Sequence, residues 1–403
     1  MARAEPLETA RQSQRFLWLY ALAVSGGAIA YVPFLTILLP LQAVALAGDA
    51  VLPLLAYAAF FGAITASMAN VAFGWLSDAL GSRRPLIAAG MIVSTILLCA
   101  MPLAVSPAVL IGMIVCWQLV LNMMLAPLAA WAGDAVPDAQ KGQLGGLLAF
   151  APALGGLSAM LVTLPGVVSL GARHAAIAVL VVSLVTPVLV FGRPVPMHHL
   201  QDPAWLDHRS AKTGAHAYGK VVRMWLARLL VQIAEASLFA FLLLWFRSLS
   251  PGFHDHDAAS IFTATLAAAV VLTVAIGRWS DRANRPILPL AISAAAAAVG
   301  LVIMAASATL AAAIAGYLVF GLASGIFLAL HSSQTLRVLP SARTRGRDLG
   351  LFNLTNTVPS LVMPWLTLAL VPIYGFGALF VLLAGLATLS CLLLVTLPRR
   401  LPG

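Results

Sequence analysis

Charged residues are scarce in this sequence. Only 9% of its 403 residues are Asp, Glu, Lys or Arg, whereas an ordinary soluble domain has about 25%. Hydrophobic residues make up 62% of the chain. This composition excludes a soluble globular enzyme, and it also excludes a disordered chain, because disorder requires low hydrophobicity.

Cysteine and catalytic motifs are also nearly absent. The three cysteines, Cys99, Cys116 and Cys391, all lie inside apolar runs, where a free thiol usually behaves as a small hydrophobic group. No CxxC or Cys/His cluster indicates a metal site. No phosphate-binding loop, nucleophile elbow or zinc helix is present in the sequence, so ATP hydrolysis and catalysis in the membrane are not supported. We expect no enzyme, no cofactor and no metal.

The sequence instead contains apolar runs of about 20 residues, the length that crosses a bilayer as an α-helix. Runs such as 175–190 and 288–312 are apolar on nearly every face, which contradicts the residue-by-residue alternation of a barrel strand. The expected spans lie near 16–40, 52–75, 86–104, 107–131, 143–164, 173–192, 221–247, 258–277, 287–306, 310–333, 349–371 and 374–397. The sequence therefore predicts an all-α membrane protein with twelve transmembrane helices.

Positive charge follows the loops. The net charge is +10, but the basic residues are scattered between apolar runs, so a nucleic-acid partner is not expected. If the N-terminus lies inside, nearly all of the 23 Lys and Arg residues fall on the cytoplasmic side, as the positive-inside rule requires. We expect a monomeric protein of the bacterial inner membrane with both termini in the cytoplasm.

Two inner loops carry the same motif. Gly74, Ser77 and Asp78 recur as Gly277, Ser280 and Asp281, each displaced by 203 residues. Basic residues follow both copies. Equal displacement indicates two duplicated six-helix units. We expect bundles at 1–192 and 220–403, joined by a cytoplasmic loop at 193–219.

The repeated motif has the chemistry of a gate. A glycine permits close helix contact, an aspartate accepts hydrogen bonds from helix amides, and an arginine pairs with carboxylates on adjacent helices. The cluster would therefore hold the cytoplasmic helix ends together. The expected gating residues are Gly74, Asp78, Arg83 and Arg84 in the first half and Gly277, Asp281, Arg282 and Arg285 in the second.

The first copy resembles the signature of the major facilitator superfamily, G-x-x-x-D-x-x-G-x-R/K-R/K. Gly74, Asp78, Gly81, Arg83 and Arg84 match its fixed positions. Twelve spans and a central loop after the sixth agree with the same family. The resemblance implies the major facilitator fold, in which two pseudo-symmetric bundles rock around a site near the middle of the membrane.

Two further motifs indicate different branches of that superfamily. The stretches 77–85, 127–142 and 346–350, together with Asn353, Asn356 and Pro359, resemble the glycoside and sucrose-type cation symporters and their bacterial relatives. The stretch 151–156, APALGG, is similar to the exporter motif G-P-x-x-G-G, with Ala151 in place of its first glycine. The direction of transport is left open by these two resemblances.

Polar residues inside the spans are the candidates for the transport site, because a charge at mid-bilayer costs about 2.5–3.5 kcal/mol on insertion scales. Arg228, Gln232 and Glu235 are separated by four and three residues, which places them on one helical face. Burial disfavours a charged carboxylate and a nearby cation favours it. We hypothesise that Glu235 is the coupling acid, with Arg228 as its partner or as a substrate ligand and Gln232 as a hydrogen-bonding group. Arg228 pointing to the interface and Glu235 bonded to another helix would explain the same residues.

The remaining candidates are less specific. Asp134 and Arg337 occupy equivalent places in the two halves, which fits a gating pair, although each can equally pair with its local helix end. His331 is a second proton candidate. Helix-to-helix hydrogen bonding is the alternative role for the polar substrate candidates. These are Gln232, Tyr57, Asn70, Trp117, Gln118, Asn122, Asn353 and Asn356.

These observations predict a secondary transporter that moves a small organic solute by alternating access. Proton-coupled symport of a sugar or glycoside is the leading hypothesis, with another cation in place of the proton as a variant. Proton-coupled efflux of a drug or metabolite is the alternative. A membrane scaffold without transport is a third hypothesis, against which the two gating motifs argue. The expected partners are the solute, the proton or other cation and the lipid bilayer.

Overall fold

The computed structural model describes residues 11–137, 140, 143–144, 147–148, 150–164, 169–195, 215–283, 285–338 and 345–397. Within these ranges, the side chains of residues 215–218, 220, 281, 332–338 and 345–353 are not described. All regular elements in the described part of the chain are helices. Such helices satisfy their own backbone groups, which is the requirement that lipid imposes. The predicted all-α fold is confirmed.

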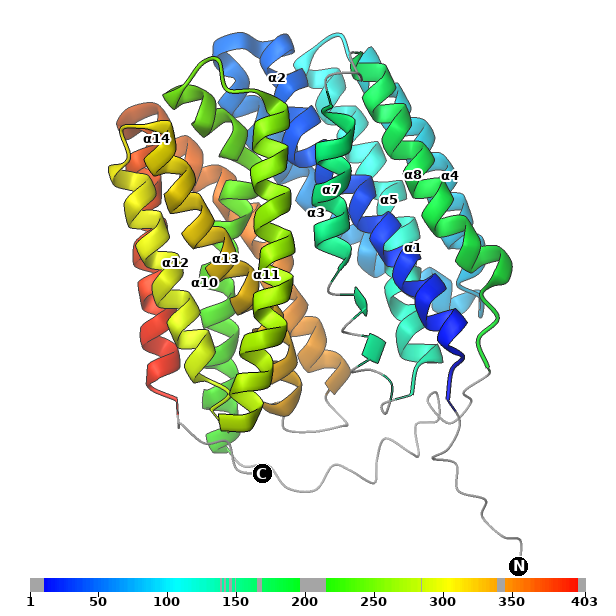
Figure 1. Ribbon diagram of the computed structural model, residues 1–403. Helices are drawn as coiled ribbons and strands as arrows, with labels where there is room; N and C mark the ends of the chain where they lie inside the picture. The colour runs from blue at the N-terminus through cyan, green and yellow to red at the C-terminus, as the bar shows by residue number, and fades with distance from the viewer. Residues whose placement is uncertain are drawn as a thin grey trace, which may run out of the picture. The chain divides into compact units, whose positions relative to one another are not determined.

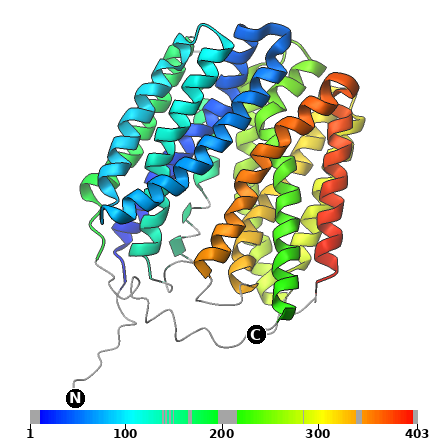
Figure 2. The same cartoon turned by 180° about the vertical axis from the view of Figure 1, so that it is seen from behind.

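The helices follow the chain in a simple order (Figures 1 and 2). The first part of the chain has α1 (Gln14–Pro33), α2 (Leu39–Ala47), α3 (Val51–Ala79), α4 (Arg84–Ala100), α5 (Pro107–Ala135), α7 (Ala151–Val162) and α8 (Leu170–Phe191). The second part has α10 (Ala215–Leu249), α11 (Asp255–Ala283), α12 (Leu288–Ala306), α13 (Leu310–Val338) and α14 (Arg345–Val395). Short helical turns occur at Phe34–Leu38, Gly48–Ala50 and Met101–Leu103.

Nine helical stretches of the described chain are long and apolar enough to cross a membrane. Two of them are too long for one crossing, because 66 residues (Gln14–Ala79) and 42 residues (Leu354–Val395) exceed the roughly 20 that a bilayer needs. Each contains a glycine of positive φ, Gly48 at 52° and Gly375 at 76°, where the chain turns back. If each of the two long stretches is counted as two crossings and the shorter helix α7 is added, the described helices correspond to the twelve predicted spans.

A π-helix interrupts the first crossing at Phe34–Leu38, between α1 and α2. Pro33 is the last residue of α1. A proline has no N–H to donate and its ring displaces the carbonyl of the preceding turn, so a change of hydrogen-bond register next to it has a physical cause. Single π-turns of this kind are often found at functional sites. The π-helix itself was not predicted from the sequence.

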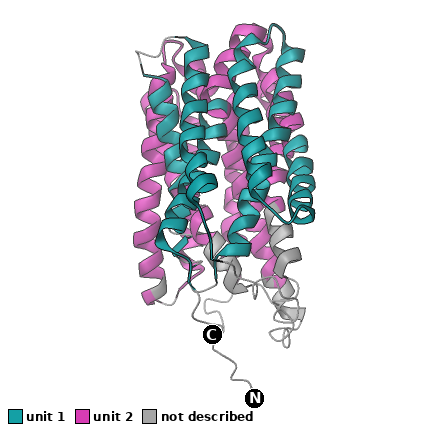
Figure 3. Cartoon of the chain, turned by 90° about the vertical axis from the view of Figure 1, so that its right-hand side faces the viewer, with its two compact units in different colours: residues 1–34, 64–210 teal, residues 35–63, 211–403 magenta. Residues whose placement is uncertain are grey.

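The chain forms two compact units, shown in Figure 3. Unit 1 comprises residues 1–34 and 64–210, and unit 2 comprises residues 35–63 and 211–403. The helical hairpin 35–63 therefore packs as part of unit 2. The predicted boundaries of the bundles, at 1–192 and 220–403, stay a prediction.

In unit 1, α1 packs against α7 and α8, and α4 packs against α5 and α8. Glycines permit these close contacts. A Cβ atom on Gly90 of α4 would lie 2.5 Å from the backbone nitrogen of Met124 on α5. Tyr20 of α1 is buried and donates a hydrogen bond to the carbonyl of Leu128, 2.8 Å away. A buried tyrosine hydroxyl needs such a partner, so this bond fixes α1 against α5.

In unit 2, α10 packs against α13 and α14, and α12 packs against the same two helices. The core between them contains Met224, Val231, Leu290, Phe327 and Leu394. Gly300 of α12 lies so close to α13 that a Cβ atom would stand 2.5 Å from the backbone nitrogen of Phe320. The polar face of α10 is therefore held on a tightly packed frame.

We predict that Gly300→Ala lowers the thermal stability of the protein, because the added methyl group meets backbone that has no flexible end to move. Overpacking of this kind costs about 1–3 kcal/mol. Gly385→Ala is the matched control, since nothing lies within 4 Å of its added Cβ and alanine favours a helix over glycine by about 1 kcal/mol. Thermal unfolding in detergent compares the two. Equal melting temperatures for both variants would contradict the close approach of α12 and α13.

Candidate functional site

Three polar side chains of α10 form the centre of the candidate site. Arg228, Gln232 and Glu235 are all half-buried, and α10 is continuous through them from Ala215 to Leu249. The helix presents them on one face because three- and four-residue spacings lie one above the other. The three side chains therefore share one face of α10, as the sequence predicts.

The guanidinium of Arg228 binds to both neighbouring helices. It donates to Thr355 Oγ1 of α14 at 3.1 Å, to the carbonyl of Leu328 of α13 at 3.2 Å, and to Asn356 Oδ1 of α14 at 3.3 Å. A guanidinium has five donors in a rigid fork and no acceptor, so this one residue fixes the relative positions of three helices. Arg228 therefore reaches into the helix bundle of unit 2.

Asn356 and Gln232 extend the network. Gln232 Nε2 donates to Asn356 Oδ1 at 3.4 Å, which is the same oxygen that accepts from Arg228. Two buried oxygens on this face accept no hydrogen bond from the described residues, namely Gln232 Oε1 and Glu235 Oε2. Glu235 interacts electrostatically with Arg228. The site thus contains one cation, one carboxyl group and two buried oxygens that lack donors.

His331 lies beside this network on α13. It is fully buried, and its Nε2 donates to the backbone carbonyl of Met224 on α10, 2.9 Å away. Its ring lies 5.4 Å from that of Phe327, centroid to centroid. The histidine is thus tied to α10 one turn before Arg228, and its role as a second proton carrier stays a prediction.

The first copy of the repeated motif forms a charged clamp in unit 1. Arg83 pairs with Asp78, binds the carboxylate of Asp134 with N–O distances of 2.9 Å, and donates to the hydroxyl of Ser77. That hydroxyl donates in turn to the carbonyl of Gly74 at 2.8 Å. Through Arg83, the clamp joins the ends of α3 and α5 at the start of α4.

Arg84 also contacts helix ends in unit 1. It donates to the carbonyl of Gly192, which follows α8, and its guanidinium carbon lies 5.5 Å from the centre of the Trp131 ring. Gly81, between α3 and α4, has a φ of +61°, a conformation that glycine adopts without strain. The two arginines thus bind different helix ends of unit 1.

The second copy is described only in part. Arg282 and Arg285 are exposed, and the amide of Arg285 donates to the carbonyl of Ser280 at 3.1 Å. A Cβ atom on Gly277 would lie 3.3 Å from the side chain of Leu330. The side chains of Asp281 and Arg337 lie outside the described side chains. Asp134 is bound by Arg83 in unit 1, and its predicted pairing with Arg337 stays a prediction.

The substrate candidates fall into two groups. In unit 1, Asn70 donates to Asn122 Oδ1 at 3.5 Å, and Asn122 donates to the carbonyl of Gln118 at 2.9 Å. Trp117 is fully buried, and its indole N–H has no partner among the described residues. The side chain of Asn353 lies outside the described ones. The asparagines thus bond between or within helices, as the alternative to substrate binding predicts.

In unit 2, Tyr57 lies in an aromatic cluster that the sequence did not predict. The ring centroid of Trp365 lies 6.3 Å from that of Tyr57 and 5.1 Å from that of Phe60. Tyr57 is 42% exposed and Trp365 is 48% exposed. Thr355 was missed as well, although it precedes the predicted Asn356. A tryptophan in an apolar span carries no sequence signal that separates it from a core residue.

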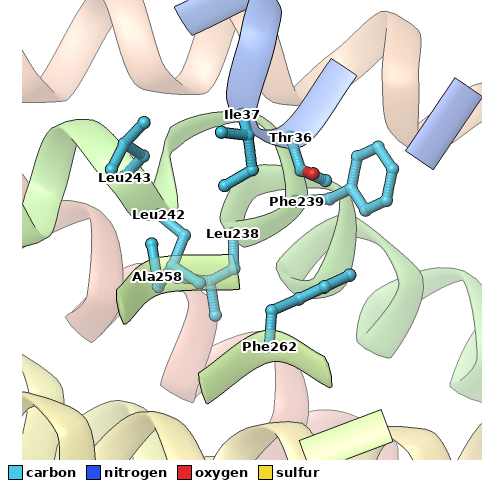
Figure 4. A pocket seen from close by; sticks show the side chains of 8 residues that line it. All are labelled: Thr36, Ile37, Leu238, Phe239, Leu242, Leu243, Ala258 and Phe262. Carbon is cyan, nitrogen blue, oxygen red and sulfur yellow. The ribbon is translucent and has the colours of Figure 1, made fainter. Parts of the chain in front are cut away.

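A small cavity lies where the π-helix meets α10 and α11 (Figure 4). Its volume is about 10 Å³, which is the lower limit for one water molecule. Thr36 supplies the polar atom that Figure 4 shows, and the other side chains are apolar. The lining consists of Thr36, Ile37, Leu238, Phe239, Leu242, Leu243, Ala258 and Phe262. This cavity is too small and too apolar to bind a polar solute.

We predict that Arg83→Ala and Asp134→Asn are coupled. Arg83 is 14% exposed and Asp134 is 33% exposed, and hydrogen bonds to charged groups contribute about 1.5–3 kcal/mol. A double-mutant cycle in thermal unfolding should therefore give a coupling energy of about 1 kcal/mol or more. Arg285→Ala, in the exposed second copy, is the control and should show no coupling to Asp134→Asn. Additive effects of the first pair would contradict the clamp.

Comparison with known proteins supports one family. Residues 224–403 match the family model described as Major Facilitator Superfamily. The crystal structure of the human organic anion transporter MFSD10 (TETRAN) matches with a TM-score of 0.71 and 15% identity, over 94% of this chain and 99% of that one. No match was found among curated protein sequences. The second half of the chain thus matches the model of this superfamily, and the chain has the fold of the MFSD10 transporter.

Proposed function

We propose that this protein is a proton-coupled secondary transporter that imports a small polar solute of the sugar or glycoside class by alternating access. The family match and the transporter of the same fold support a secondary transporter and a small-molecule substrate in a lipid bilayer. They point away from an enzyme. The coupling to protons, the sugar substrate and the inward direction go beyond these two matches.

The observation that carries the proposal is the carboxyl group of Glu235. Its Oε2 is buried and accepts no hydrogen bond from the described residues, although it lies within electrostatic range of Arg228. A buried charge without a donor is costly, whereas a water-filled site or a nearby cation favours the ionised form. A group whose protonation depends on access to water can load a proton on one side of the membrane and release it on the other.

Other described residues of unit 2 fit a hydroxylated solute. Gln232 and Asn356 offer amide groups, and Tyr57 and Trp365 offer partly exposed aromatic rings. Small-molecule sites typically combine aromatic walls with a few placed polar groups. A sugar has both hydroxyl groups and apolar ring faces, which is why we favour it over a purely apolar substrate.

Efflux of a drug or metabolite is the second candidate function. The APALGG stretch forms the first half of α7, and a Cβ atom on its Gly155 would lie 2.9 Å from the side chain of Val32 on α1. The structural neighbour is an organic anion transporter, which also favours a substrate other than sugar. Counterflow with radiolabelled sugars, set against resistance profiling of expressing cells, separates import from efflux.

The proposal includes a monomer in the bacterial inner membrane with both termini in the cytoplasm. Single cysteines introduced at Arg11 and at Gly252 test the orientation in intact cells, after the three native cysteines are replaced by serine. Only the cysteine at 252 should react with a membrane-impermeant maleimide. Labelling at residue 11 would reverse the assigned topology without affecting the transport proposal.

We predict that Glu235→Gln abolishes proton-coupled uptake. Purified protein is placed in liposomes that contain a pH-sensitive dye, and mono- and disaccharides are added without an imposed gradient. One sugar should acidify the interior with wild-type protein and not with the variant, because an amide does not carry a proton. Asp257→Asn, in the first turn of α11, is the control and should behave as wild type. Full acidification with Glu235→Gln would exclude this residue as the coupling acid.

We also predict that Trp365→Ala raises the KM for the transported solute about three- to tenfold, since an aromatic contact contributes about 0.5–1.5 kcal/mol. Tyr374→Ala on the same helix is the matched control, because Tyr374 is 69% exposed. Uptake kinetics in liposomes give KM and kcat, and thermal unfolding reports any loss of stability. An unchanged KM for Trp365→Ala would remove the aromatic cluster from the solute site.

A further inference from the structure

The hydrogen bonds around Asn356 determine which way the amide of Gln232 points. Arg228 has only donors, so the Asn356 atom that it contacts at 3.3 Å must be the oxygen Oδ1. Gln232 contacts the same oxygen at 3.4 Å, so it must do so with its Nε2 donor. The carbonyl oxygen Gln232 Oε1 is consequently directed away from Asn356. Its orientation follows from the chemistry of Arg228 and not from a choice between two equivalent amide positions.

Two buried acceptors therefore lie one turn apart on α10. Gln232 Oε1 and Glu235 Oε2 are both inaccessible, and neither accepts a hydrogen bond from the described residues. Residues separated by three positions are neighbours on a helix, with Cβ atoms about 5–6 Å apart. Buried acceptors without donors are rare and each calls for an explanation. Both oxygens are acceptors while Glu235 is unprotonated, so neither can satisfy the other.

A single proton on Glu235 would give both of these oxygens a hydrogen-bond partner. When Glu235 is protonated on Oε2, that atom becomes a donor and Gln232 Oε1 becomes its acceptor, so a single added proton forms one O–H bond and one hydrogen bond. We propose that Gln232 is the positioning residue that holds the coupling proton on Glu235, with its carbonyl oxygen as the acceptor of the Glu235 hydroxyl. The inference rests on the proposed function, because it presumes that Glu235 is the group that loads the proton.

The network gives Arg228 an indirect role in the same step. Arg228 contacts Asn356, Asn356 accepts from the Nε2 of Gln232, and the oxygen of Gln232 is thereby left as its unpartnered atom. A change in the position of Arg228 would consequently alter the acceptor available to the proton. A rearrangement of α13 or α14, which supply the acceptors for Arg228, would in this way be linked to proton release at Glu235.

Two titratable groups among the described side chains lie within electrostatic range of Glu235. Arg228 lies on the same helix, and α13 contributes Tyr317, which is 4% exposed and within electrostatic range of Glu235. His331 of α13 interacts electrostatically with Arg228. In sequence, α11 has charged residues only in its first turn and its last two turns, and α14 has them only in its first turn. Tyr317 is therefore the described alternative to Gln232 as a partner of the Glu235 carboxyl, and the test must separate the two.

Infrared difference spectroscopy of the purified full-length protein tests this proposal without a substrate. A protonated carboxyl group gives a C=O stretching band, and a hydrogen bond donated by that carboxyl lowers the band frequency. Acidification of wild-type protein should produce such a band, and its absence in Glu235→Gln assigns it to Glu235. In Gln232→Leu, the band should move to higher frequency. Its pH midpoint should move to lower pH by about one unit, a tenfold loss of proton affinity, since one lost hydrogen bond is worth about that much.

Three variants make the result decisive. Gln42→Leu replaces another buried glutamine, which is 4% exposed and lies on α2, and it should leave the band and the midpoint unchanged. Gln232→Met keeps the length of the side chain and serves if Gln232→Leu does not fold. An unchanged band in both Gln232 variants would overturn the proposal. A band that moves in Tyr317→Phe and not in the Gln232 variants would also overturn it, by assigning the carboxyl to Tyr317.

The same experiment separates failure of this inference from failure of the proposed function. If no carboxyl band is lost in Glu235→Gln, then Glu235 does not bind a proton in the accessible pH range, and the coupling role itself is wrong. If the band is lost there but is insensitive to Gln232, the coupling acid stands and its positioning residue is wrong.

Discussion

The burial of Arg228 within a helix bundle is the constraint on which the polar site depends. A guanidinium cannot lose its charge in a protein, so inside a membrane it must find acceptors. Arg228 finds them in Thr355, Leu328 and Asn356 on two neighbouring helices. These bonds hold α10, α13 and α14 in register and orient Gln232 through Asn356. The carboxyl group of Glu235 thereby lies in a site whose one described cation is already bonded to neutral protein groups.

The two halves of the chain share a motif, yet the described parts of its two copies make different contacts. In the first half, Arg83 is bound by two carboxylates and is mostly buried. In the second half, Arg282 and Arg285 are exposed. The polar cluster of α10 belongs to unit 2, whereas the charged clamp belongs to unit 1. Each unit thus contributes different chemistry on a related arrangement of helices.

The fold was predictable from the sequence because lipid imposes a simple rule. Every span had to be about 20 residues long and apolar, and the structure contains helices at all twelve predicted places. The common face of Arg228, Gln232 and Glu235 also followed from helical spacing alone. The partners of these residues did not. Thr355 and the carbonyl of Leu328 come from distant parts of the chain, and neither a threonine in an apolar span nor a backbone carbonyl has a sequence signature.

We expect Glu235 to be the residue that gains and loses the coupling proton. Counting protons released by purified protein in unbuffered detergent solution, as the pH is raised from acidic to alkaline, tests this claim most directly. Wild-type protein should release one proton per molecule more than Glu235→Gln, because the amide of the variant carries no titratable proton. Equal proton counts for the two proteins, both shown to be folded, would contradict the account.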